Sequence, residues 1–114
     1  MIQRYDSNNR LSHAVVHNGF VFVAGQVADN TSADVQGQTE QVLAKIDALL
    51  TKAGSGRSRI LSASVWLPNI ENFARFNTVW DAWVPQGDAP ARACVESRLA
   101  NPLLSVEVAV IAAV

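Results

Sequence analysis

The stretch APARACVESRLANPLLSVEVAVIA, from Ala89 to Ala112, carries the pattern that decides the predicted fold. It predicts two strands joined by a short turn. Arg92 lies at the start of the first strand and Glu107 lies inside the second, and the residues around each are mostly apolar. Burying a charge without a partner is costly. The two groups therefore either serve a functional site or are structural ions at a subunit contact.

The composition indicates one domain, residues 1–114, that associates with copies of itself. Hydrophobic residues make up 49% of the 114 residues and charged residues only 17%, against a usual quarter. A domain of this length has much surface to cover. We therefore expect part of its apolar surface to be covered by another subunit.

Several classes of function are excluded by charge and cysteine content. The net charge is −1 and no lysine–arginine cluster is present, which argues against a nucleic-acid partner. The single cysteine, Cys94, excludes an internal disulfide and most cysteine-based metal sites. Residues 1–10 hold no long apolar run, and no stretch approaches the roughly 20 residues that span a bilayer. We expect a soluble cytoplasmic protein without a membrane partner.

The first half of the chain predicts three strands and a helix. Asn18-Gly19, between the apolar runs 14–17 and 20–24, is the strongest short signal for a β-hairpin, because both residues tolerate positive φ. Residues 2–5 fit a preceding edge strand. Helical spacing of apolar residues begins near Asp34 and ends before Gly54, which is placed as a C-terminal cap glycine. Ser32 or Asp34 can cap the start of this helix.

The second half predicts a strand, a helix and the final pair of strands. Residues 60–67 read as a strand, and Asn69 can cap the helix that follows and ends at Pro85. That helix carries a stripe of large apolar side chains, which we interpret as core facing the sheet rather than as a ligand site: Ile70, Phe73, Phe76, Trp80 and Trp83.

The predicted order is thus β-β-β-α-β-α-β-β, and two amphipathic helices covering one sheet face make a two-layer α+β sandwich. The opposite face has no helix to cover it, although its strands remain apolar. We assign to this uncovered face Val15, Phe20 or Val21, Val65, Val106 and Val108. The sheets are therefore expected to associate with one another.

A register for the last two strands follows if Leu99 pairs with Leu104. Arg92 would then face Ile111, on the same side of the sheet as Glu107 and roughly 13 Å along the strands from it. A small anion would fit between the two charges. From the residues alone, a structural ion pair and a ligand site both remain open.

The run from Pro90 to Glu96, followed by Val106-Glu107-Val108, resembles the C-terminal signature of the Rid / YjgF-type family of reactive intermediate imine deaminases. The resemblance covers nearly the whole chain. The Asn18-Gly19 hairpin leads into residues 24–27 as in that family. Residues 38–54 fit its first helix, and residues 73–83, which include Asn77, fit its second.

The resemblance implies a chorismate-mutase-like homotrimer, with the sheets in a central barrel, the helices outside and ligand sites between subunits. It implies hydrolysis of 2-imino acids or their enamine tautomers to 2-oxo acids and ammonia, without a metal or organic cofactor. Arg92 would bind the substrate carboxylate with its planar fork. Glu107 would position a water and act as general base or proton shuttle.

The resemblance also marks Gly25, Cys94, Asn77 and Ser12 as candidates to line the substrate site. We interpret Cys94 as a pocket wall rather than a nucleophile, because no histidine lies near it in sequence. One position departs from the family pattern. Leu11 stands where many catalytic members carry a tyrosine, which leaves Ser12 or Arg10 to replace that contact. A non-catalytic protein that binds a carboxylate metabolite in the same cleft is therefore the alternative.

Overall fold

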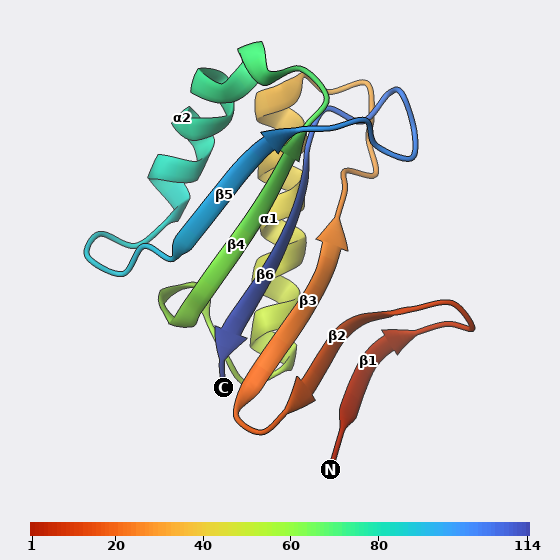
Figure 1. Cartoon of the computed structure of the whole chain (residues 1–114), viewed down its shortest axis with the longest axis vertical. Coiled ribbons are helices and arrows are strands. Elements are labelled where there is room, and N and C mark those ends of the chain that lie inside the picture. The colour runs from red at the N-terminus through yellow and green to blue at the C-terminus, as the bar shows by residue number, and fades with distance from the viewer.

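The computed structural model describes all residues from Met1 to Val114. Its main elements are β1 (Gln3–Ser7), β2 (Ser12–His17), β3 (Phe20–Gln26), α1 (Val35–Lys52), β4 (Ile60–Leu67), α2 (Phe73–Trp83), β5 (Ala91–Glu96) and β6 (Glu107–Ala113). Short 3₁₀ turns precede β4 and α2. Both helices lie on one side of a six-stranded sheet (Figure 1), which confirms the predicted element order and the two-layer α+β sandwich. Neither helix is both long and apolar enough to cross a membrane.

The strands follow the order β1-β2-β3-β6-β4-β5, and only the β4–β5 pair is parallel. The predicted hairpin between the last two strands is wrong, as is its Leu99–Leu104 register, because β4 lies between β5 and β6. The segment from residue 97 to 106 crosses over the end of β4 instead of turning back at once. Gln38 of α1 holds that crossing, since its Nε2 donates to the Leu103 carbonyl (3.1 Å) and its Oε1 accepts from the Ser105 N–H (2.9 Å).

Local signals position most of the turns and helix ends as predicted. Asn18 and Gly19 have φ values of 51° and 82°, as a tight two-residue hairpin requires. The Asp34 carboxylate accepts a hydrogen bond from Gly37 N (2.9 Å) and so caps α1, and Gly54 (φ 81°) lies just beyond its end. Asn69 caps the 3₁₀ turn at 70–72 rather than α2 itself.

The hydrophobic core lies between the two helices and the sheet. Three members of the aromatic stripe are buried there as predicted, namely Phe76, Trp80 and Trp83, whereas Ile70 and Phe73 are 40% and 41% exposed. The valines Val65, Val106 and Val108 also face the helices and are almost fully buried. Their assignment to the uncovered face is therefore wrong. Strand alternation indicates which residues share a face, but not which of the two faces the helices cover.

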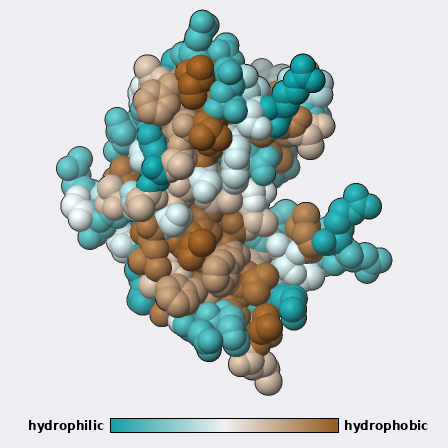
Figure 2. All heavy atoms as spheres, viewed as in Figure 1, coloured by the Kyte–Doolittle hydropathy of each residue, from teal (hydrophilic) through white to brown (hydrophobic).

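The open face of the sheet is nevertheless apolar. Phe20, Phe22 and Val95 are 42–49% exposed there, and a shallow depression of about 210 Å³ lies beside Phe22, Ala109 and Ile111. Figure 2, in the same view as Figure 1, shows hydrophobic residues gathered over this part of the sheet. Of the residues predicted for this face, Phe20 lies on it, as does Val15, which pairs with Phe22, and its apolar character agrees with the prediction.

Candidate functional site

Arg92 extends from the edge strand β5 toward α2. It pairs with Ala63 of β4, which is buried beneath the helices, so both side chains lie on the helix-facing side of the sheet. The Nη1 group of Arg92 donates to Asn77 Oδ1 over 2.9 Å. The guanidinium carbon lies 5.2–5.7 Å from the ring centroids of three α2 side chains: Phe73, Phe76 and Trp80.

This setting leaves Arg92 able to bind an anion. The structure has four ion pairs, and none of them includes Arg92. A guanidinium has five N–H donors, of which Asn77 accepts one. Aromatic faces and a neutral amide therefore hold the charge in place without neutralising it. A half-buried guanidinium with free donors is suited to a carboxylate, which it can bind through two parallel hydrogen bonds.

Glu107 lies at the start of β6 and is packed against Gly25 of β3. A Cβ atom at Gly25 would overlap the Oε2 atom of Glu107, so only glycine leaves room for the carboxylate in this position. Burial raises the pKa of Glu107 above its ordinary value. No ion pair stabilises its charge. Such a carboxyl group exchanges protons closer to neutral pH than an exposed glutamate does, which suits acid–base chemistry.

The two charges lie on opposite faces of the sheet. Glu107 pairs with Trp66 and Arg92 with Ala63, and positions 63 and 66 of β4 point to opposite sides because they are three residues apart. They are separated by roughly 10 Å along β4 and by two strand spacings, again about 10 Å, across it. The predicted arrangement on one face is wrong, and the two groups form no ion pair with each other within the chain. One chain alone cannot place both groups around one small ligand.

Three of the four other predicted site residues divide between these two centres. Asn77 and Cys94 lie with Arg92, and Gly25 lies with Glu107. Burial raises the pKa of the Cys94 thiol, although the Arg92 charge partly opposes this, so the thiol is not activated as a nucleophile. Ser12 joins neither centre, because its hydroxyl is hydrogen-bonded to the hydroxyl of Ser7 (2.7 Å) between β1 and β2.

Phe76 and Trp80 were predicted only as core residues, but they also touch the guanidinium of Arg92. The sequence holds a signal for this second role. Phe73, Phe76 and Trp80 recur along α2 at spacings of three and four residues, and Asn77 lies four residues after Phe73 and three before Trp80. An amide among aromatic rings on a helix that covers a sheet is a suitable seat for an arginine from an edge strand.

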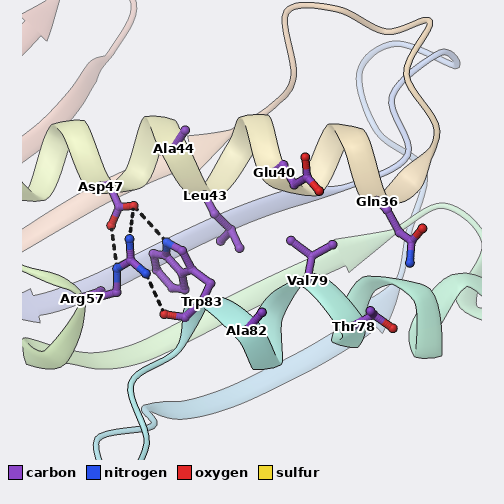
Figure 3. A pocket seen from close by; sticks show the side chains of 10 residues that line it. All are labelled: Gln36, Glu40, Leu43, Ala44, Asp47, Arg57, Thr78, Val79, Ala82 and Trp83. Atoms are coloured by element: carbon purple, nitrogen blue, oxygen red, sulfur yellow. Dashed lines mark hydrogen bonds and ion pairs between the residues drawn. The ribbon is translucent and has the colours of Figure 1, made fainter.

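A larger groove, of about 480 Å³, runs between α1 and α2 on the outer surface and contains none of the predicted site residues. Figure 3 shows that Asp47, Arg57 and Trp83 converge at one end of it. The Asp47 carboxylate accepts hydrogen bonds from Arg57 Nη2 (2.8 Å) and from Trp83 Nε1 (3.0 Å). Arg57 Nη1 also donates to the Trp83 carbonyl (3.0 Å). These bonds use the polar groups to join the helices, so we interpret this end of the groove as structural.

Comparison with known proteins agrees with the geometry. Residues 1–114, the whole chain, match the family described as endoribonuclease L-PSP. The chain belongs to this family. A RutC family protein from Haemophilus ducreyi is 45% identical over 114 residues, covering 100% of this chain and 97% of the relative. The RutC family protein YoaB from Escherichia coli is 44% identical, covering 99% and 98% of the two chains.

Solved structures place this member of the family among Rid and YjgF proteins. The YjgF family protein NMB1025 from Neisseria meningitidis has a TM-score of 0.97 at 42% identity, covering 99% of this chain and 94% of that one. The Rid family protein YyfA from Yersinia pestis has a TM-score of 0.86 at 32% identity, covering 95% and 90%. The predicted Rid / YjgF membership is confirmed.

Proposed function

We propose that this protein hydrolyses small 2-imino acids, or their enamine tautomers, to 2-oxo acids and ammonia, and so removes reactive intermediates from metabolism. The observation that carries the proposal is the setting of Arg92. Its guanidinium is fixed by Asn77 and three aromatic rings, yet it has no carboxylate partner. A carboxylate on a small substrate is the group that would complete this arrangement.

Arg92 would hold the carboxylate of the substrate and thereby orient the adjacent C=N bond. The guanidinium offers two parallel donors to the two carboxylate oxygens, which fixes the direction of the substrate as well as its position. The Cys94 thiol, kept neutral by burial, would form a wall beside it. Because an imine carbon is already electrophilic, orientation supplies much of the rate.

Glu107 would act on the water. Its carboxylate takes a proton from a water molecule as the oxygen of that water bonds to the imine carbon, and it returns this proton to the nitrogen to give a carbinolamine. The carboxylate then carries the hydroxyl proton of the carbinolamine to the amino nitrogen, the C–N bond breaks, ammonia leaves, and the carbonyl of the 2-oxo acid forms. The raised pKa of Glu107 lets it accept and return the proton at modest cost, and Gly25 keeps the carboxylate in place.

Each complete site would lie between two subunits of a homotrimer. The open face of the sheet, with Phe20, Phe22 and Val95 exposed, is the surface that would be buried on association. Association would bring the Arg92 edge of one chain to the Glu107 face of the next. The separation of the two charges on opposite faces of a single chain supports this assembly.

The test is a coupled assay in which an amino acid oxidase generates the imine and semicarbazide traps what remains. The wild-type protein should lower the yield of semicarbazone, whereas Arg92→Ala should not. Arg75→Ala is the matched control, because Arg75 belongs to α2 but pairs with Asp34 away from the site. Equal rates for wild type and Arg92→Ala would overturn the proposal.

The alternative is a non-catalytic protein that binds a carboxylate metabolite in the same cleft. Leu11, which stands at the position of the tyrosine in many catalytic members and is 45% exposed, supports it. Under this alternative, calorimetry would show binding of a 2-oxo acid that depends on Arg92, and the coupled assay would show no turnover.

A further inference from the structure

A separate cavity of about 290 Å³ lies on the helix side of the sheet, between α1 and the first three strands. Its polar lining comes from Asp6, His13, Gln26, Lys45 and Lys52. None of these residues belongs to the proposed imine site. Gln26 follows Gly25 directly, but it pairs with Val108 and faces the helices, whereas Gly25 contacts Glu107.

The Gln26 amide determines which nitrogen of His13 accepts a hydrogen bond and which one carries the proton. Its side chain is buried, with 4% of the residue exposed, and its Nε2 donates to the Ala24 carbonyl (2.9 Å). This bond orients the amide, because a carbonyl oxygen can only accept. The second N–H therefore points to His13 Nδ1 (3.1 Å), which must be the acceptor. The imidazole proton is then on Nε2, and Gln26 Oε1 has no hydrogen-bond partner in the protein.

The two lysines bring more donors than their partners use. They are seven residues apart on α1, two turns or about 10 Å. Lys45 Nζ donates to the Val27 carbonyl and to Asp29 (both 2.8 Å), and Lys52 Nζ donates to Asp6 (2.7 Å). Since an ammonium has three N–H groups, one remains on Lys45 and two remain on Lys52. The Asp29 side chain is 87% exposed, so water screens its attraction for Lys45.

The cavity thus presents spare ammonium donors and an imidazole N–H. Its free acceptors are Gln26 Oε1 and the remaining lone pairs of the Asp6 carboxylate, whose charge is offset by its ion pair with Lys52. We propose that it binds a compact oxyanion, a carboxylate or a phosphate group, which the lysines and His13 contact as donors. Gln26 Oε1 would accept a hydrogen bond from a hydroxyl or ammonium group on the same ligand. The volume corresponds to about ten waters, which suits a small metabolite. This site is independent of the imine site and does not rest on the proposed function.

The test follows the His13 ring and the Gln26 side-chain amide by nitrogen-15 NMR in the full-length protein. Sodium phosphate and sodium acetate are added separately, with sodium chloride at equal ionic strength as the baseline. Saturable shifts with either oxyanion and none with chloride are expected. Saturation with phosphate alone assigns a phosphate group, and saturation with acetate alone assigns a carboxylate. If neither phosphate nor acetate gives saturable shifts, the proposal is overturned.

Variants separate this site from general charge effects. Lys52→Gln and Lys45→Gln should each weaken binding about tenfold, the loss expected for one charge-assisted hydrogen bond. Both lysines are partly exposed, so the variants should fold, as circular dichroism would verify. Arg75→Gln is the matched control and should leave affinity unchanged. Unchanged affinity in both lysine variants, or loss of binding in Arg92→Ala, would refute the separate site.

Discussion

The two faces of the sheet support the charges of the candidate site differently. On the helix side, Arg92 rests on aromatic rings of α2 and on the Asn77 amide, so its position is set by its own chain. On the open side, Glu107 is packed only against Gly25 and the strands beside it, and the apolar surface around it has no cover. The fold covers the helix side, whereas it leaves the open side uncovered, as the proposed association of subunits would require.

This difference explains how a small protein can keep both charges without an internal ion pair. If Arg92 and Glu107 met within one chain, each would neutralise the other and the site would hold no ligand. Opposite faces prevent that meeting. The comparison therefore predicts that each chain supplies one half of a site at Arg92 and one half of another at Glu107, and that the proposed chemistry requires two chains.

The largest expected effect comes from removing one half-site at a time. Arg92→Ala and Glu107→Gln should each lower kcat/KM for an imino acid by about 10³-fold, through loss of carboxylate binding and of proton transfer. After the two variants are unfolded together and refolded as an equal mixture, about a quarter of the wild-type activity should return. Half of the chains carry an intact Arg92 and half carry an intact Glu107, so about a quarter of the sites between chains would have both. No recovery, despite mixed assemblies seen by mass spectrometry, would place the whole site within one chain.

A charge on the open face should have the next largest effect. Phe22→Asp puts a carboxylate into the surface proposed to be buried, and an unpaired buried charge costs about 3 kcal/mol or more, a factor of about 10² in association. Light scattering should show a monomer, and activity should fall with the assembly. Thr51→Asp, on the exposed outer surface of α1, is the control and should change neither. A wild-type protein that is monomeric in solution would contradict the proposal that a second chain covers the open face.

The sequence predicted the local structure well because local signals are strong. The hairpin at Asn18-Gly19, the cap at Asp34 and the strand at 60–67 each follow from one or a few neighbouring residues. The position of β5 in the sheet does not follow from neighbouring residues. Whether β5 pairs with β6 or with β4 depends on contacts far apart in sequence, including the bonds of Gln38 to residues 103 and 105, which no spacing rule reveals.

The sequence proposed residues for the candidate site, but it did not predict their geometry. Arg92 and Glu107 were found because charges on apolar strands are conspicuous, and the family resemblance gave them roles. The prediction placed both side chains on one face because it paired β5 directly with β6. In the structure β4 lies between these strands, and a shift of one residue in the register moves a side chain to the other face. The aromatic support of Arg92 was missed because the stripe was interpreted as core alone, and the Asn77 amide beside its rings was not connected with Arg92.

A smaller effect is expected from Gly25→Ala. The added Cβ would displace the Glu107 carboxylate, which is the flexible end of a side chain, so folding should be nearly unaffected. Activity should nevertheless fall by about 10- to 100-fold, because a general base displaced by about 1 Å loses its alignment with the water. Gly56→Ala is the matched control, since nothing lies within 4 Å of its added Cβ. Full activity in Gly25→Ala at normal melting temperature would show that the position of Glu107 does not matter.

The smallest effect concerns the stability of the open face. Because burial raises the pKa of Glu107, the folded state binds its proton more tightly than the unfolded state, so folding stability contributed by this group falls as pH rises past its ordinary value. Glu107→Gln removes that penalty. Its melting temperature should exceed that of wild type by about 1–3 °C at pH 8, a small gain for a half-exposed group, and the gain should vanish near pH 4. Glu71→Gln, at an exposed position, should show no such difference. A wild type that is more stable than Glu107→Gln at pH 8 would mean that a cation stabilises this carboxylate, and Glu107 would then be a structural ion rather than half of a site.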